Sequence, residues 1–227
     1  MSAAQFLGEI HGKCVENVRD VLANVNTVSY IVDVLGQLGR PFTEENIKCV
    51  PSRVAITSGR AAVGAVPAGD TSIASTVPNM TEAGYMWTET SIAQKGDIVL
   101  HEDQLRTRED IERALRHELI HAFDDARGFV EPTNCYHHAC SEIRAARLSG
   151  DCFVGQEVRR GNFDIFGGRS CVKRRAAMSV ENNPMCRGGG ERAVEVVFGA
   201  CYADYEPFVA PVYNMGSIDG PAKHFWS

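Results

Sequence analysis

The sequence predicts a mostly helical α+β fold, with a small β-sheet beside one central helix. Apolar residues recur at helical spacing near both ends of the chain, and a short apolar run leads directly into a helical stretch at about residues 108–127. With 227 residues and 44% hydrophobic content, the chain can bury a substantial core. We therefore expect one domain over residues 1–227.

The first expected element is helical and runs from about Gln5 to Leu38. Gly39 and Pro41 end it, because neither residue favours the interior of a helix. The apolar residues of this segment lie mostly three or four positions apart, as on one face of a helix: Val18, Val21, Leu22, Val25, Val28, Ile31, Val32, Leu35 and Leu38.

Two strands and a long irregular segment are expected next. Residues 47–56 favour a strand, but Pro51 lacks an amide hydrogen and restricts this segment to an edge or irregular strand. Residues 57–95 are rich in Gly, Ala, Ser, Thr and Pro, so we expect a long insertion or a mobile loop there. Regular structure returns with a short strand at residues 96–101.

The central helix is expected from Arg108 to about Arg127. Thr107 is a suitable N-cap, and Glu109 and Asp110 complement the helix dipole in the first turn. Gly128 supplies a stop.

Three more helices are expected in the C-terminal half of the chain. A polar turn at residues 134–138 precedes a helix at 139–152, and two further helices cover residues 170–182 and 190–202. The tail at residues 207–227 is expected to be irregular.

The central helix contains the pattern His117-Glu118-x-x-His121. Residues four positions apart share a face of a helix, so the two imidazoles can bind one cation. Glu118 points away from that axis, where its carboxylate can take a proton from a water in an open coordination position. The flanking Leu119 and Ile120 are apolar, which indicates a helix packed in a core. The pattern predicts a zinc (Zn²⁺) hydrolase. The alternative is a pair of histidines that binds no metal and is either exposed or hydrogen-bonded in the core.

A catalytic zinc takes three protein ligands and keeps one position open. Glu142, on the next expected helix, is the strongest candidate for the third ligand. The small side chains three, four and seven residues after it let two helices approach closely. The spacing resembles that of zinc peptidases in which a glutamate from a following helix completes the site. A salt bridge to a nearby arginine is the alternative for Glu142, and His137 and His138 are rival ligands or helix caps.

Asp125 lies on roughly the same face as the two histidines but is an unsuitable ligand. Eight residues separate it from His117, which corresponds to a rise of about 12 Å along a helix. Asp124 and Asp125 are better placed as acceptors that orient the imidazoles, or as solvent-facing charges.

Peptide hydrolysis requires two further features, a binding place for the substrate and a group that stabilises negative charge. An edge strand at residues 96–101 could hold an extended substrate by strand addition, although an ordinary core strand fits the sequence equally well. A group must also stabilise the negative charge that develops on the substrate, and four residues are candidates: His101, Tyr136, His137 and His138.

Composition excludes some classes of protein and leaves the cysteines open to three interpretations. The net charge of −6 argues against nucleic acid as the main partner. No apolar run is long enough to span a bilayer, and the first residues resemble neither a secretory signal nor a matrix presequence.

The eight cysteines fit buried thiols, a soft-metal site, or disulfides in an oxidising compartment. The even spacing of Cys171, Cys186 and Cys201 suits helices joined by a disulfide near their ends.

Three sequence strings together resemble the mitochondrial inner-membrane-associated metalloprotease family that assists ATP synthase assembly. They are HELIHAFDDAR, HHACSEIRAARLSGDC and CVKRRAAMSVENNPMC. The segment KGDIVLHEDQL also resembles the strand before the family's active helix, and a weaker likeness runs from about Cys14 to Phe208. Residues 57–95 depart from the family pattern because they form a much longer segment.

The resemblance implies a zincin-like metalloprotease domain, with His117 and His121 as zinc ligands and Glu118 as the catalytic residue. It also implies residence in the intermembrane space, peripheral to the inner membrane, which would explain the cysteine count and the missing presequence. The implied partner is a protein substrate, the precursor of an ATP synthase membrane subunit.

Three functions fit these observations. The first is a zinc endopeptidase, and the second is a non-proteolytic assembly factor or chaperone that retains a zinc site. The third is a structural zinc protein, which would unfold when the metal is removed.

Overall fold

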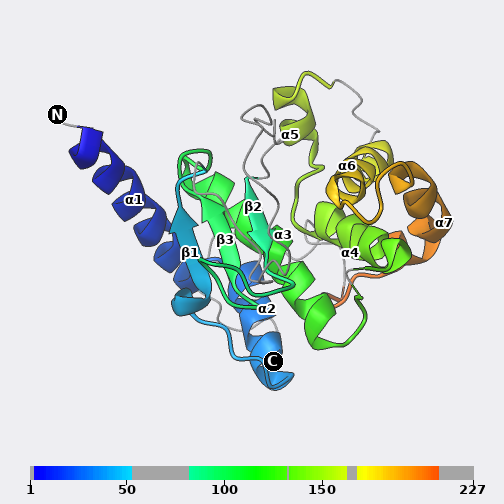
Figure 1. Ribbon diagram of the computed structural model, residues 1–227, viewed down its shortest axis with the longest axis horizontal. Helices are drawn as coiled ribbons and strands as arrows, with labels where there is room; N and C mark the ends of the chain where they lie inside the picture. The colour runs from blue at the N-terminus through cyan, green and yellow to red at the C-terminus, as the bar shows by residue number, and fades with distance from the viewer. Residues whose placement is uncertain (1–2, 53–81, 132, 163–167, 210–227) are drawn as a thin grey trace, which may run out of the picture.

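The computed structural model describes residues 3–52, 82–131, 133–162 and 168–209 (Figure 1). These residues form seven α-helices and one three-stranded sheet. The expected α+β class is confirmed. The helices α1 and α2 lie with the sheet on one side of α3, and α4, α6 and α7 lie together on the other side (Figure 1).

The N-terminal segment forms two helices, where one helical segment was expected. Helix α1 spans Ala3–Asn24 and α2 spans Asn26–Gln37, separated by Val25 in an extended conformation with φ −100° and ψ 107°. Val21, Val25 and Val28 are all fully buried. The bend therefore lets both helices turn their apolar faces into the same core.

The sheet has the strand order β1-β3-β2. Strand β1 (Ile47–Val50) pairs in parallel with β3 (Ile98–His101), and β2 (Ala83–Tyr85) pairs antiparallel with β3. The expectation of an edge strand at β1 is confirmed. The strand is shorter than expected, because it ends immediately before Pro51, which cannot donate a backbone hydrogen bond.

The position of β3 corrects one prediction. Both of its sides are occupied, by β1 and β2, and its four residues are all buried. It is therefore a central core strand, and the prediction of substrate addition to this strand is wrong. Strand β2 lies inside the segment 57–95 that was expected to be irregular. Of the same segment, residues 86–95 form no helix or strand, and residues 57–81 lie outside the described residues.

Helix α3 (Arg108–Ala126) agrees with the predicted central helix. The Thr107 hydroxyl accepts a hydrogen bond from the Asp110 N–H, and the Asp110 carboxylate accepts one from the Thr107 N–H. This reciprocal pair satisfies two amides at the start of the helix. At the end, Gly128 has φ +74°, a conformation that favours glycine.

The C-terminal helices are α4 (Cys135–Leu148), α5 (Val154–Arg159), α6 (Gly168–Asn182) and α7 (Gly190–Ala203). The positions of α6 and α7 agree with expectation. Helix α4 begins earlier than predicted, because the Asn134 side chain caps the N–H groups of Tyr136 and His137. The expected polar turn is therefore the first turn of the helix. The short helix α5 was not predicted.

All eight cysteines form disulfides, which selects one of the three interpretations of the cysteine content. One bond joins α1 to β1, and the other three join α4 and its following turn to α6, α7 and the turn between them. Cys171, Cys186 and Cys201 therefore bond to the region of α4 and not to one another. The four pairs are Cys14–Cys49, Cys135–Cys186, Cys140–Cys201 and Cys152–Cys171.

The described part of the C-terminal tail packs against α2. The Phe208 side chain is buried and stacks on Tyr30, whose hydroxyl donates a hydrogen bond to the Pro207 carbonyl. The rest of the expected irregular tail, residues 210–227, lies outside the described residues. Within the residues that the structure describes, no helix has the length and apolarity needed to cross a membrane.

Candidate metal centre

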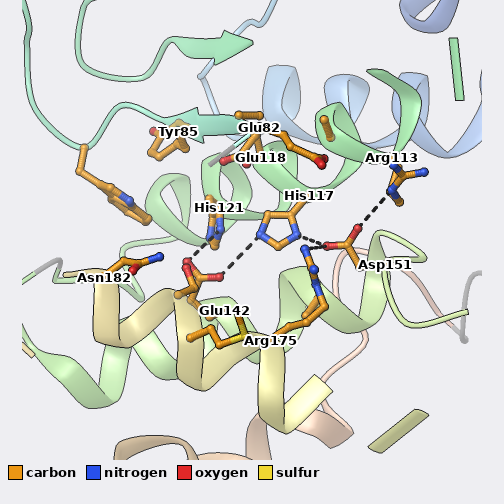
Figure 2. Close-up of a pocket in the computed structure, with 17 residues that line it drawn as sticks. Glu82, Tyr85, Arg113, His117, Glu118, His121, Glu142, Asp151, Arg175 and Asn182 are labelled. Atoms are coloured by element: carbon orange, nitrogen blue, oxygen red, sulfur yellow. Dashed lines mark hydrogen bonds and ion pairs between the residues drawn. The ribbon is translucent and has the colours of Figure 1, made fainter. Parts of the chain in front are cut away.

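A cavity of about 430 Å³ lies between β2 and α3 on one side and α4 and α6 on the other (Figure 2). The residues of the histidine-containing motif face it from α3, and Glu142 faces it from α4. The cavity therefore lies between the two hydrophobic clusters of the molecule, one containing the sheet and the other the C-terminal helices.

Three of the predicted site residues converge in this cavity. His117, His121 and Glu142 each offer one ligand atom, and these atoms lie within 4.8 Å of one another. The His117 Nε2 is 3.6 Å from Glu142 Oε2, and the His121 Nε2 is 3.5 Å from Glu142 Oε1. Figure 2 shows both imidazoles directed at the carboxylate between them.

The other nitrogen of each imidazole is engaged. The His117 Nδ1 lies 3.0 Å from Asp151 Oδ2, and the His121 Nδ1 lies 2.7 Å from the Ser141 Oγ. A polar partner at Nδ1 fixes the orientation of a ligand histidine and leaves Nε2 for the metal. The two Nε2 atoms are thus the ones presented to the cavity.

Asp151 and Ser141 are themselves held by charged groups. Arg113 and Arg175 contact the Asp151 carboxylate at 3.5 and 3.3 Å. The Ser141 hydroxyl lies 3.0 Å from Asp124 Oδ2, and Asp124 pairs with Arg144 at 3.1 Å.

The two aspartates near the end of α3 have different roles. Asp124 reaches His121 only through Ser141, so its expected role as an orienting acceptor is indirect. Asp125 accepts a hydrogen bond from the Tyr85 hydroxyl and pairs with Arg40, so it orients neither imidazole.

Burial and the neighbouring charges separate the pKa values of these groups. Burial lowers the pKa of His121 to about 3, so this ring is neutral and can donate a lone pair. Burial would also lower the pKa of His117, but hydrogen bonds with Asp151 and Glu142 raise it well above its usual value. Burial would raise the pKa of Glu142, but His121, His117 and His138 lower it well below its usual value.

The spacing of these atoms fits a tetrahedral zinc ion. Zinc binds nitrogen and oxygen ligands at roughly 2.0–2.2 Å, which puts two ligand atoms about 3.4 Å apart in a tetrahedral site. The His117 and His121 Nε2 atoms lie 3.6 and 3.5 Å from the two different oxygens of Glu142, and both separations are close to that value. Two imidazoles and one carboxylate also form a donor set that catalytic zinc uses.

Glu118 lines the same cavity and has only 6% of its surface exposed. Burial raises its pKa to about 7, and a backbone hydrogen bond with Tyr85 of β2 acts in the opposite direction. A carboxyl group that titrates near neutrality can both accept and release a proton during a reaction. The expectation that Glu118 lies beside the ligand atoms, and not among them, agrees with the geometry.

The four residues expected to stabilise negative charge are placed elsewhere. In the described part of the chain, the cavity is lined by none of them. His101 is buried in β3, and Tyr136 is exposed on the first turn of α4. His137 accepts a hydrogen bond from the Glu131 N–H, and His138 contacts Glu142. Side chains that carry N–H donors and do line the cavity include Trp87, Arg113, Arg175 and Asn182.

Sequence reasoning missed several residues of the site, notably Trp87, Ser141 and Asp151. The Trp87 ring packs edge-on against His121 at 6.0 Å between ring centroids. Asp151 precedes Cys152, and its contact with His117 spans 34 residues of chain. Only its place in the SGDC string, between α4 and α5, was available as a signal.

Several curated proteins are similar to this chain. The mitochondrial inner membrane protease atp23 of Schizosaccharomyces pombe is 46% identical over 115 residues, 49% of this chain and 62% of that protein. The mitochondrial inner membrane protease ATP23 of Mycosarcoma maydis is 36% identical over 162 residues, 70% of this chain and 75% of that protein. The protein of the same name in Kluyveromyces lactis is 42% identical over 118 residues, 49% of this chain and 48% of that protein.

The chain spans less than two thirds of the length of the Schizosaccharomyces pombe and Kluyveromyces lactis proteins. No solved structure matches the chain. The pattern of the peptidase M76 family matches residues 12–209, which include every site residue described above. Because this match covers most of the sequence, the chain belongs to the peptidase M76 family.

Proposed function

We propose that the chain is a zinc-dependent endopeptidase with a zincin-like active site. His117, His121 and Glu142 hold the metal, and Glu118 is the catalytic base. The convergence of two imidazole Nε2 atoms and a carboxylate in one cavity carries this proposal, together with the buried Glu118 beside them. Membership of a peptidase family supports hydrolysis of a peptide bond.

The residues of the cavity have separate roles in hydrolysis. When bound, zinc supplies a Lewis acid that polarises a carbonyl group and lowers the pKa of water. Glu118 takes a proton from the attacking water and passes it to the leaving amine. Asp151 and Ser141 hold the imidazoles in place throughout.

The edge of β2 is the expected binding place for an extended substrate. Glu82 and Met86, which flank β2, both bond in the direction of β3. The Glu82 carbonyl accepts from the His101 N–H, and the Met86 N–H donates to the Asp97 carbonyl. Backbone groups of neighbouring residues in a strand point to opposite sides. Those of Ala83 and Tyr85 therefore point away from β3. The Tyr85 N–H on this side bonds to Glu118, whereas the Ala83 groups are placed where a peptide can add as a further strand.

The disulfides and the relatives support a proposed compartment for the protein. Four disulfides favour an oxidising environment, and the relatives are named as proteases of the mitochondrial inner membrane. We therefore expect the protein in the intermembrane space, peripheral to the inner membrane. The substrate expected from the family resemblance is the precursor of an ATP synthase membrane subunit.

The variant Glu118→Gln tests this function. The substitution keeps the size of the side chain but removes the base, so zinc should still bind while cleavage of a peptide library falls by at least about 10²-fold. Glu109→Gln makes the same change at an exposed position of α3 and should cleave like the wild type. Undiminished cleavage by Glu118→Gln, or a wild-type chain that takes up no zinc, would overturn the proposal.

A further inference from the structure

His138 lies one helical turn before Glu142 on α4 and contacts it directly. The His138 Nε2 is 3.2 Å from Glu142 Oε1, and the His138 side chain is 13% exposed. The same carboxylate faces the His117 and His121 Nε2 atoms. A group that bonds to one oxygen of this carboxylate therefore influences how the carboxylate faces the proposed metal.

The direction of this hydrogen bond follows from Asn183, which comes directly after α6. The Asn183 Oδ1 accepts a hydrogen bond from the Met185 N–H at 3.0 Å. Its Nδ2 is therefore the atom that lies 3.1 Å from the His138 Nδ1, and an amide nitrogen can only donate. Because Nδ1 accepts, the proton of the neutral ring is on Nε2 and is donated to Glu142.

This arrangement excludes His138 as a rival ligand. Its Nδ1 lone pair accepts from Asn183, and its Nε2 carries the proton donated to Glu142. Neither nitrogen offers a lone pair to a cation, although the ring lies next to one of the proposed ligands.

A disulfide holds together the two segments that carry this chain of hydrogen bonds. Cys135 lies three residues before His138, and Cys186 lies three residues after Asn183. Their bond joins the first turn of α4 to the turn after α6, with the Cα atoms 5.5 Å apart. The cross-link therefore sets the distance that the Asn183–His138 hydrogen bond has to span.

We propose that His138 is a positioning residue that holds the Glu142 carboxylate toward the metal, with its tautomer fixed by Asn183. Each of the three proposed ligands then has its own supporting group, namely Asp151 for His117, Ser141 for His121 and His138 for Glu142. The role rests on the proposed zinc site. Partners of this kind raise metal affinity by orienting the ligand, and their removal costs roughly 10–100-fold.

The first test compares zinc affinities, measured by competition with a chromophoric chelator, in the full chain with its disulfides intact. His138→Leu removes the N–H donor and should lower the affinity roughly 10–100-fold. His138→Gln keeps an N–H donor one turn from Glu142 and should recover most of the loss. His137→Leu makes the same change one residue earlier, outside the cavity, and should bind like the wild type.

The second test needs no metal. Long-range ¹⁵N–¹H NMR of the zinc-free protein should show His138 protonated at Nε2 and not at Nδ1, with the resonance assigned by its loss in His138→Gln. In Asn183→Leu the His138 Nδ1 loses its donor while Glu142 still accepts from Nε2, so this tautomer preference should weaken but not reverse. Circular dichroism confirms that the variant is folded.

The results separate this inference from the proposed function. If the wild type binds zinc and His138→Leu binds it equally well, the positioning role is wrong and the metal site stands. An Nδ1-protonated His138 in the wild type would also overturn the role. A wild-type chain that binds no zinc would overturn the metal site and the positioning role together.

Discussion

His117 donates a hydrogen bond from Nδ1 to Asp151 Oδ2 at 3.0 Å, across 34 residues of chain. The same carboxylate contacts Arg113 of α3 and Arg175 of α6, as Figure 2 shows. One buried side chain between α4 and α5 therefore fixes a proposed metal ligand and also connects two helices that face each other across the cavity. The orientation of His117 thus depends on tertiary structure as much as on its own helix.

Zinc affinity should depend on Asp151. Asp151→Asn keeps an oxygen acceptor for the His117 Nδ1 but removes the charge, whereas Asp151→Ala removes both, so the alanine variant should bind more weakly. A total loss of roughly 10–100-fold is expected in chelator competition. Asp103→Asn alters a carboxylate that bonds to Ser52 outside the cavity, and it should not change the affinity. Equal zinc affinity in all three variants would show that Asp151 does not support the metal site.

Ser141 should contribute to both stability and metal binding. Ser141→Ala leaves the His121 Nδ1 and one oxygen of Asp124 without the hydroxyl between them, in a site where all three residues are buried. Unmet buried polar groups cost about 1–3 kcal/mol, which urea unfolding of the zinc-free protein would measure. Zinc affinity should fall in parallel. Ser29→Ala removes a hydroxyl that bonds to the Val25 carbonyl and serves as the control.

Proline substitutions in β2 should separate substrate binding from stability. Ala83→Pro removes an N–H that points away from β3, so the sheet should survive while cleavage of extended peptides weakens, chiefly through a higher KM. Gly84→Pro removes an N–H on the side of β3 and should instead destabilise the fold. Peptide kinetics and thermal unfolding of both variants give the comparison. An Ala83→Pro variant with wild-type KM would show that the substrate binds elsewhere.

Local signals in the sequence were sufficient to predict which residues converge at the centre of the candidate site. The limits of α3 depend on Thr107, Asp110 and Gly128, which act within one turn of the helix ends. The pairing of His117 with His121 is a property of helical spacing alone. Glu142 was found because the small residues on its helix face allow α3 and α4 to approach closely, and the structure brings its carboxylate to both imidazoles.

The features that sequence did not predict depend on contacts between distant segments. Strand β3 is central because β2, from a segment with no strand pattern, pairs with it. The partner of each cysteine is set by how α4 packs on α6 and α7, and spacing alone could not show it. The tautomer of His138 requires knowledge of Asn183, 45 residues away.

Stability should fall in acid partly through Glu157. Burial would raise the pKa of this carboxyl group, but hydrogen bonds and charges of Arg174 and Arg160 lower it below the usual value. A group with a lowered folded pKa stabilises the protein above its unfolded pKa, and this contribution disappears as the pH falls through the folded pKa. Glu157→Gln should therefore be less stable than the wild type at pH 7.

The pH dependence of that difference is the critical measurement. Urea unfolding at a series of pH values should show the gap between wild type and Glu157→Gln closing below about pH 4.5, where unfolded glutamate begins to bind protons. Glu191→Gln, at an exposed position of α7, should run parallel to the wild type. A gap of constant size down to the lowest pH would show that Glu157 acts through its shape and not its charge.

Loss of the Cys135–Cys186 disulfide should weaken zinc binding as well as the fold. A double Ala variant releases the turn carrying Asn183 from the first turn of α4, so the hydrogen bond from Asn183 to His138 is no longer held at its length. Unfolding should cost about 2–4 kcal/mol less than in the wild type.

The comparison that isolates the effect on zinc uses another disulfide outside the cavity, Cys14–Cys49. It joins α1 to β1 and has no contact with the ligands, so the double Ala variant at those positions should lose stability while keeping wild-type zinc affinity. Both variants are compared at a temperature where circular dichroism shows each to be folded. Of these two disulfides, only Cys135–Cys186 is connected to Glu142 through the His138 contact. An equal fall in zinc affinity for both variants would therefore mean that general loosening of the fold controls the site. The hydrogen bonds from Asn183 through His138 to Glu142 would then not be the cause.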